Sequence, residues 1–192
     1  MKNILLIGCG GHCKSVIDVI EQEGVYRIKG LVNSPDSNIQ EVSGYPVIGS
    51  DFDLKDLSEE YTYAFIAVGQ IYSPDLRISL FKNLKQLGFK LPKIISPLSY
   101  VSKSSSVSEG SIVMHHSIIN ANSFIGRNCI INSKALIEHD CIVNDFCHIS
   151  TNVTINGGVN VGEKSFIGSG STTKEGISIE DSSFIKAGSV VK

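Results

Sequence analysis

Valine and isoleucine recur at every sixth position over the second half of the chain. Read in steps of six, these positions are Val101, Val107, Val113, Ile119, Ile125, Ile131, Ile137, Val143, Ile149, Ile155, Val161, Ile167, Thr173, Ile179, Ile185 and Val191. Four residues after most of them comes a small side chain such as Ser, Ala or Cys. A period of six fits neither an α-helix nor a heptad, and it is typical of a parallel β-helix built from hexapeptides.

The hexapeptide frame also predicts which residues stack. Three hexapeptides form one triangular coil (3 × 6 = 18 residues), so residues 18 positions apart should stack at about 4.8 Å. His139 then sits at a corner with Gly157 above it, and Gly158 stacks on Asp140. Glycine at this place lets a ligand approach the backbone N–H closely.

Two further features follow from the same spacing. His148 lies half a coil beyond His139, so the two histidines should meet in one site only across a subunit boundary. A column of small residues leaves room for a long, thin ligand, and it consists of Thr151, Ser169 and Ala187. The prism leaves an apolar face and open ends, which threefold packing commonly covers, so we expect a homotrimer.

The first half of the chain alternates between short apolar runs and helical periodicity. The expected strands are residues 3–7, 28–32, 63–68 and 93–95, and the expected helices run from 15 to about 24 and from 76 to 87. This alternation predicts a small, doubly wound parallel sheet. We therefore expect an α/β domain over residues 1–96, followed by a β-helix domain over residues 97–192.

A glycine-rich turn follows the first expected strand. Gly8 and Gly10 match the first and third glycines of the dinucleotide fingerprint, but Cys13 stands at the sixth position. No acidic residue ends the second strand, and both departures disfavour NAD. The turn either holds a phosphate at a helix N-terminus or is a tight turn without a ligand. His12 either contacts such a ligand or caps the helix.

Composition limits the classes of partner and location. The formal net charge is -2, so no excess of basic residues predicts binding to nucleic acid or to an anionic membrane. The N-terminal apolar run is too short for a signal peptide, and no apolar stretch reaches the roughly 18 residues of a membrane span. A cytoplasmic protein is expected. Cys129, Cys141 and Cys147 occupy small-residue positions of the repeat, where we expect compact buried side chains.

His139 is the strongest candidate for chemistry because it lies between Glu138 and Asp140. A neighbouring carboxylate can orient an imidazole as a general base. A lone surface histidine is also commonly idle, and the residues by themselves leave both interpretations open.

Two motifs, together with the repeats, resemble a known family. They are Gly8-Cys9-Gly10-Gly11-His12-Cys13-Lys14 and Ile137-Glu138-His139-Asp140-Cys141. The chain resembles the sialic acid O-acetyltransferase and sugar N-acetyltransferase family, whose members include enzymes that acetylate UDP-4-amino-sugars. The resemblance implies a Rossmann-like domain that holds a nucleotide-sugar, a left-handed β-helix that forms a trimer, and acetyl-CoA bound between adjacent β-helices.

The resemblance also assigns roles to individual residues. His139 would be the general base, Asp140 its acidic partner and Asn132 a residue near the acceptor. The residues that match acetyl-CoA contacts are His148, Gly157, Ser169 and Ala187, with the Gly157 N–H in an oxyanion-type role. The residues that match nucleotide-sugar contacts are Gly10, Gly11, His12, Val32, Asn33 and Gly69. UDP, GDP, dTDP and CMP sugars all remain open.

The implied function is acetyl-CoA-dependent N-acetylation of a nucleotide-linked 4-amino-sugar in bacterial glycan biosynthesis. Two alternatives are O-acetylation of sialic acid or a related sugar, and a non-catalytic trimeric protein that binds nucleotide-sugars. A zinc hydratase with the same β-helix needs three converging histidines. The spacing of His115, His116, His139 and His148 disfavours that arrangement, and no metal is expected.

Overall fold

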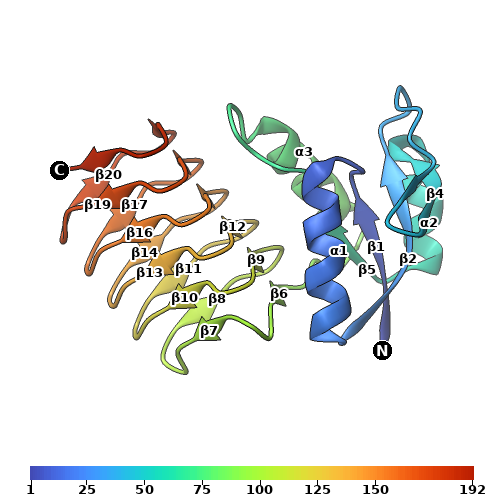
Figure 1. Cartoon of the computed structure of the whole chain (residues 1–192). Helices are drawn as coiled ribbons and strands as arrows, with labels where there is room; N and C mark the ends of the chain where they lie inside the picture. The colour runs from blue at the N-terminus through green and yellow to red at the C-terminus, as the bar shows by residue number, and fades with distance from the viewer. The chain divides into compact units, whose positions relative to one another are not determined.

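The computed structural model describes all 192 residues, and the chain divides into two compact units (Figure 1). The first unit comprises Met1–Gly69 and Asp75–Pro92, and the second comprises Gln70–Pro74 and Lys93–Lys192. No helix in either unit is both long enough and apolar enough to cross a bilayer.

A five-stranded sheet forms the centre of the first unit, in the order β3-β4-β2-β1-β5. Its strands are β1 (Lys2–Ile7), β2 (Tyr26–Asn33), β3 (Glu41–Val42), β4 (Tyr45–Ser50) and β5 (Tyr63–Ile66). All neighbours are parallel except β3 and β4, which form an antiparallel edge. Central strand β1 is fully buried over Ile4–Ile7, as expected for a sheet covered on both faces.

The helices of this unit are α1 (Gly11–Glu23), the 3-10 helix η1 (Asp51–Asp53), α2 (Leu54–Glu60) and α3 (Asp75–Gln86). The predicted end of α1 is confirmed, because Gly24 has a left-handed φ of 67° and donates its N–H to the Ile20 carbonyl. Helix α3 buries Leu80, Phe81 and Leu84. These elements confirm the predicted α/β class.

The sequence analysis missed β3, β4 and α2. Strand β4 is only half buried and contains Pro46 and Gly49, so its apolar pattern is weak. Pro46 is accommodated because it lies opposite Glu41 in the antiparallel edge pair. Helix α2 buries only Leu54, and a helix with so narrow an apolar face gives no clear periodicity.

The second unit is a triangular prism of two-residue strands. They are β6 (Ile94–Ile95), β7 (Tyr100–Val101), β8 (Ser106–Val107), β9 (Ile112–Val113), β10 (Ile118–Ile119), β11 (Phe124–Ile125), β12 (Ile130–Ile131), β13 (Leu136–Ile137), β14 (Ile142–Val143), β15 (His148–Ile149), β16 (Thr154–Ile155), β17 (Asn160–Val161), β18 (Phe166–Ile167), β19 (Thr172–Thr173), β20 (Ser178–Ile179), β21 (Phe184–Ile185) and β22 (Val190–Val191).

These strands form three parallel sheets, visible as successive coils in Figure 1. We name them face I (β6, β9, β12, β15, β18, β21), face II (β7, β10, β13, β16, β19, β22) and face III (β8, β11, β14, β17, β20). The chain passes from face I to face II to face III and back to face I. We call the turns between successive faces corner I/II, corner II/III and corner III/I. Pairing of Ile119 with Ile137 shows the predicted 18-residue register.

The residues of the six-residue frame fill the prism. Ile119, Ile137 and Ile155 are completely buried in one stack. The exception in the frame, Thr173, is also buried, and its hydroxyl accepts the N–H of Asn156 at 2.9 Å. The prediction of a hexapeptide β-helix is therefore confirmed.

One predicted strand belongs to the other unit. Residues 93–95 were expected to end the α/β sheet, but Ile94 and Ile95 pair with Ile112 and Val113 as the first strand of face I. That prediction was wrong, because an apolar doublet fits a parallel sheet and a β-helix coil equally well.

The small-residue positions link one coil to the next. The Ser111 hydroxyl donates to the Gly126 carbonyl at 2.6 Å and accepts the Cys129 N–H at 2.8 Å. The Cys129 and Cys141 thiols donate to carbonyls in the same way, and burial raises the pKa of the Cys141 thiol. All five cysteines are free and buried. The structural role predicted for Cys129, Cys141 and Cys147 is confirmed.

Candidate active site

Corner II/III presents His139 and Asp140 to solvent. The side chains are 62% and 58% exposed, and Asp140 has the left-handed φ of 59° typical of these turns. His139 Nδ1 lies 2.8 Å from Asp140 Oδ2. Because an ionised carboxylate only accepts hydrogen bonds, Nδ1 is the donor, and Nε2 of the neutral ring carries the free lone pair. The pair therefore presents a basic nitrogen.

Two hydrogen bonds hold Asp140 in its ionised form. The bond from His139 and, secondarily, the bond from Asn122 Nδ2 lower the pKa of the Asp140 carboxyl. The other flanking acid, Glu138, accepts a hydrogen bond from Asn120 Nδ2 at 2.8 Å instead. Of the two carboxylates beside His139, Asp140 is therefore the one that orients the imidazole.

Gly157 lies directly against the imidazole, as the column spacing predicted. A Cβ at this position would be 2.8 Å from both Cε1 and Nε2 of His139. The Gly157 N–H has no hydrogen-bond partner within the chain, whereas the next N–H, of Gly158, donates to the His139 carbonyl at 3.0 Å. Corner II/III thus combines a basic nitrogen with an open N–H donor.

His148 lies on face I and is only 7% exposed. Its Nδ1 donates to the backbone carbonyl of Gln70, so Nε2 accepts from Asn132 Nδ2 at 3.2 Å. The ring also packs edge-on against Phe166. The structure brings the two predicted residues His148 and Asn132 together, and it places them on a different face from His139.

Gln70 is a residue of this region that sequence reasoning missed. Besides accepting from His148, it donates through Nε2 to the Phe146 carbonyl at 2.8 Å. It precedes the repeats and belongs to no periodic pattern, so nothing in the sequence singled it out.

The small-residue column lies at corner I/II. The carbonyls of Thr151 and Ser169 accept N–H groups from the next coil, each at 2.9 Å. The N–H groups of Ser169 and Ala187 have no partner within the chain. They stand one coil apart, about 4.8 Å, and offer two successive donors to an elongated ligand with amide carbonyls. A single chain therefore places this column and His139 at different corners.

In the first unit, the glycine turn and the end of β2 border one cavity of about 270 Å³. Gly8 has a φ of 109°, and a Cβ there would collide with Val68, so glycine is required. A Cβ on Gly10 would meet no atom within 4 Å, so its backbone is open to a ligand. The predicted residues Gly10, Val32 and Asn33 line this cavity together, and Asp51 joins them.

The other predicted nucleotide-sugar residues lie next to this cavity. Gly11 begins α1 and borders a neighbouring hollow with Lys14. His12, in the first turn of α1, lies beside Gly69, where a Cβ would be 3.5 Å from that of His12. The sequence analysis missed Asp51 and Lys14, and Asp51 could not be placed without strand β4.

Buried Arg77 fixes the segment that leads to Gly69. Its guanidinium donates to the carbonyls of Ile66 and Val68 at 3.1 and 2.6 Å. The sequence analysis missed Arg77, although an arginine within the apolar pattern of a helix can indicate a buried, hydrogen-bonded side chain.

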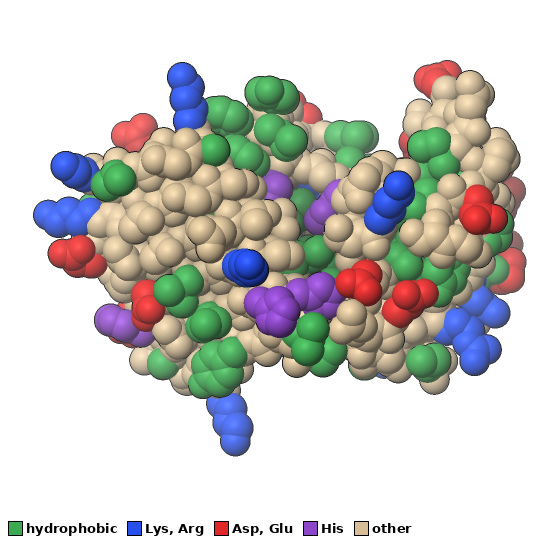
Figure 2. Space-filling view, viewed as in Figure 1, with side chains coloured by type: hydrophobic (Ala, Val, Ile, Leu, Met, Phe, Trp, Pro, Cys, Tyr) green, Lys and Arg blue, Asp and Glu red, His purple; other side chains and the backbone are tan.

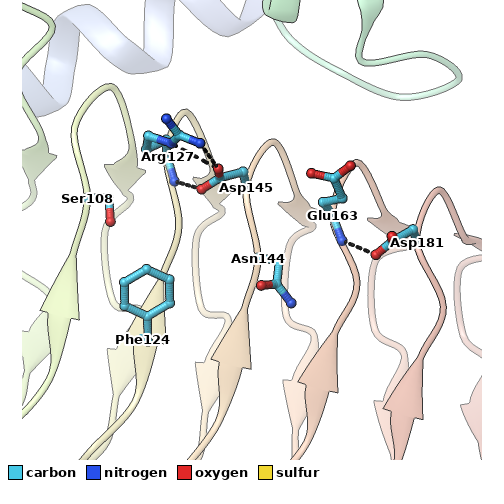
Figure 3. A pocket seen from close by; sticks show the side chains of 7 residues that line it. All are labelled: Ser108, Phe124, Arg127, Asn144, Asp145, Glu163 and Asp181. Carbon is cyan, nitrogen blue, oxygen red and sulfur yellow. Dashed lines mark hydrogen bonds and ion pairs between the residues drawn. The ribbon is translucent and has the colours of Figure 1, made fainter.

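A groove of about 630 Å³ opens along face III and corner III/I (Figure 3). It contains none of the predicted site residues. Its lining residues are Ser108, Phe124, Arg127, Asn144, Asp145, Glu163 and Asp181. Asp145 accepts the Arg127 N–H at 2.6 Å and Arg127 Nε at 2.9 Å, and Asp181 accepts the Glu163 N–H at 2.8 Å. The chain itself thus pairs the main polar groups of this groove.

Charged side chains are interspersed on the face shown in Figure 2, where acidic and basic groups do not gather into one patch. No group of three or more His, Cys, Asp or Glu residues is arranged to hold a metal ion.

Two family models match the chain. Residues 3–84 match the PglD N-terminal domain, and residues 158–192 match the hexapeptide repeat of succinyl-transferase. A search of curated proteins found no match.

Solved structures resemble the whole chain. PerB from Caulobacter crescentus, in complex with CoA and GDP-perosamine, is 34% identical with a TM-score of 0.93, and the match covers 100% of this chain and 89% of that one. The acetyltransferase domain of PglB from Neisseria gonorrhoeae is 31% identical with a TM-score of 0.90, over 100% and 92% of the two chains. The chain therefore belongs to the sugar acetyltransferase family with a PglD-type N-terminal domain and a hexapeptide-repeat β-helix, as its motifs predicted.

Proposed function

We propose that the protein transfers the acetyl group of acetyl-CoA to the amine of a nucleotide-linked amino-sugar. The observation that carries the proposal is the match over 100% of this chain to a perosamine N-acetyltransferase crystallised with CoA and GDP-perosamine. A structure of the PglB domain contains acetyl coenzyme A. The open N–H groups of Gly157, Ser169 and Ala187 fit a ligand with a thioester and amide carbonyls.

The residues at corner II/III supply the chemistry. His139 Nε2 takes the proton of the sugar amine as the amine attacks the thioester carbonyl carbon, while Asp140 holds the ring through Nδ1. The Gly157 N–H donates to the carbonyl oxygen as it gains negative charge. His139 then returns the proton to the departing sulfur as the carbon–sulfur bond breaks, so that the N-acetylated nucleotide-sugar and the free CoA thiol leave. No covalent enzyme intermediate is required.

Binding is divided between the two units in this proposal. The first unit holds the nucleotide-sugar through Gly10, Gly11, His12, Val32, Asn33 and Gly69, and the second unit carries the acetyltransferase site. Asn132 lies near the acceptor, and His148, Ser169 and Ala187 contact acetyl-CoA.

A homotrimer completes the site. His139 lies at corner II/III, the Ser169 column at corner I/II and His148 on face I, so only a neighbouring copy can unite them. Exposed Ile118, Phe124 and Ile142 on faces II and III offer apolar contact area for such copies. The reaction is placed in the cytoplasm, where acetyl-CoA is available and buried cysteines stay reduced.

The test is an acetyl-CoA-dependent thiol-release assay with GDP- and UDP-linked 4-amino-sugars, and with sialic acid as a hydroxyl acceptor. The expected product is an N-acetylated nucleotide-sugar, identified by a mass increase of one acetyl group. Release of thiol only with sialic acid would show O-acetylation. Nucleotide-sugar binding without any acetylated product would show a non-catalytic binding protein. Light scattering that gives a monomer mass would contradict the trimer.

A further inference from the structure

The cavity beside the glycine turn contains one carboxylate that the chain leaves unused. Asp51 begins η1 directly after β4 and lines the cavity with Gly10 and Val32. Strand β4 runs parallel to β2, with Asn33 paired to Ser50. Asp51 therefore follows the strand next to the one whose end carries an acid in dinucleotide-binding folds.

Asn33, which occupies the end of β2, is engaged with its own turn. Its Oδ1 accepts the Ser34 N–H at 3.0 Å, and its Nδ2 donates to the Ser37 hydroxyl at 2.7 Å. This amide organises the backbone after β2, and it keeps one N–H and one lone pair for a ligand but no negative charge.

A capping box fixes the place of Asp51. The Asp53 carboxylate accepts the N–H and the hydroxyl of Ser50 at 2.7 and 2.8 Å, and these bonds lower the pKa of the Asp53 carboxyl. Asp51 lies inside this closed turn. No hydrogen bond or ion pair within the chain involves its own carboxylate.

The surroundings of this carboxylate are apolar on the cavity side. The apolar lining residues are Ile7, Val32, Val68, Leu76 and Leu80. Partial burial raises the pKa of the Asp51 carboxyl. An ionised carboxylate accepts hydrogen bonds and donates none, so its complement is a ligand with adjacent hydroxyl or N–H donors.

We propose that Asp51 accepts hydrogen bonds from the 2′- and 3′-hydroxyls of the ribose in the nucleotide-sugar, and so selects ribonucleotides over 2′-deoxyribonucleotides. This inference rests on the proposed function and narrows the nucleotide that it leaves open. Apolar side chains enclose the nucleoside, and the glycine turn faces its diphosphate. A dTDP-sugar, which lacks the 2′-hydroxyl, is disfavoured, whereas GDP- and UDP-sugars are accepted.

The test compares paired nucleotides by titration calorimetry on the full chain. GDP and 2′-deoxy-GDP, and separately UDP and 2′-deoxy-UDP, are bound to the wild type, to Asp51→Asn and to Asp56→Asn. Asp56 is an exposed acid in the first turn of α2, outside the cavity, and it is the matched control for charge.

The wild type should bind each ribonucleotide about 10- to 100-fold more tightly than its deoxy partner, as expected for one hydrogen bond to a charged group. Asp51→Asn keeps a neutral acceptor oxygen and should reduce this ratio by about 5- to 10-fold, whereas Asp56→Asn should keep the wild-type ratio. Equal weakening of both partners by Asp51→Asn would overturn the inference, and so would a change only in the preference between GDP and UDP. A wild type that binds ribonucleotide and deoxyribonucleotide equally overturns the inference alone, whereas one that binds no nucleotide also contradicts the proposed function.

Discussion

Corners II/III and III/I of the β-helix have the same turn geometry but use their polar groups differently. At corner III/I, Asp145 and Asp181 cap the N–H groups of Arg127 and Glu163 in the preceding coil. At corner II/III, His139 occupies the turn position that corresponds to Asp145, six residues earlier in the frame. Its Nδ1 donates to the adjacent Asp140 carboxylate, and the Gly157 N–H stays open. At corner III/I the polar groups therefore bond to one another. At corner II/III a basic nitrogen and an N–H donor remain without a partner in the chain.

Cavity volume and unused hydrogen-bonding groups point to different corners of the β-helix. The groove at corner III/I, about 630 Å³, is bordered mainly by groups that already have partners. Corner II/III is exposed, and in the proposed trimer a neighbouring copy would supply a wall for it. The proposed site therefore follows the unused hydrogen-bonding groups of corner II/III rather than the larger volume at corner III/I.

The largest expected effect comes from removing the base. His139→Asn keeps a polar side chain of similar size but has no basic nitrogen, so kcat should fall by about 10²- to 10⁴-fold. Affinity for CoA should stay unchanged, which calorimetry can measure. Two structures of the Caulobacter enzyme carry a substitution of one histidine and still contain CoA and GDP-perosamine.

The matched control is His116→Asn, at an exposed turn position of corner I/II with a φ of 60°. Asparagine tolerates this backbone conformation, and turnover should stay within about twofold. Equal losses in both variants would mean that His139 has no special role.

A smaller effect is expected from crowding the base without removing it. In Gly157→Ala the new Cβ would lie 2.8 Å from His139 Nε2, so the ring must move while the Gly157 N–H remains. The value of kcat should fall by about 10- to 100-fold, because a displacement of about 1 Å in a positioned catalytic group can cost that much.

A double-variant cycle tests whether this loss acts through the ring. When His139 is already Asn, adding Gly157→Ala should change kcat by less than about twofold. An undiminished second loss would show that alanine blocks the substrate rather than displacing the base.

The fold was predictable to the extent that periodicity dictates it. The frame from Val101 to Val191 determines the register, and the structure reproduces it in every coil. Between residues 41 and 60, the half-buried β4 and the weakly amphipathic α2 give no periodic signal. The position of β4 depends on pairing with β2, a tertiary contact that sequence spacing does not encode.

The residues of the candidate site were predictable where the 18-residue spacing of the β-helix determines which side chains stack. The 18-residue spacing predicted that Gly157 lies against His139 and that His148 lies apart from both. Asp51 and Gln70 were missed because each lies in or directly after a segment that has no clear hydrophobic periodicity. Spacing could not anticipate that Glu138 bonds to Asn120 and leaves Asp140 as the partner, since both acids flank His139.

Removing only the charge of that partner should have a more moderate effect. Asp140→Asn retains an oxygen that can accept from His139 Nδ1 but no longer stabilises the imidazolium formed during transfer. Because the pair is exposed and solvent screens it, kcat should fall by about tenfold. The measurement is kcat at saturating substrates, with thermal unfolding as the control. A fall as large as that of His139→Asn would contradict the expected screening and show that the base depends fully on the charge of Asp140.

The smallest effect on turnover is expected at corner III/I. Asp145→Ala removes the carboxylate that accepts hydrogen bonds from the backbone N–H and the guanidinium of Arg127. Both bonds lie within one chain and involve no proposed ligand. Stability should fall by about 1 kcal/mol, or about 2–4 °C in Tm, while kcat stays within about twofold. Calorimetric melting and the thiol-release assay measure the two quantities on one preparation. The opposite pattern, lost turnover with unchanged Tm, would place this groove in the active site and remove the distinction between the two corners.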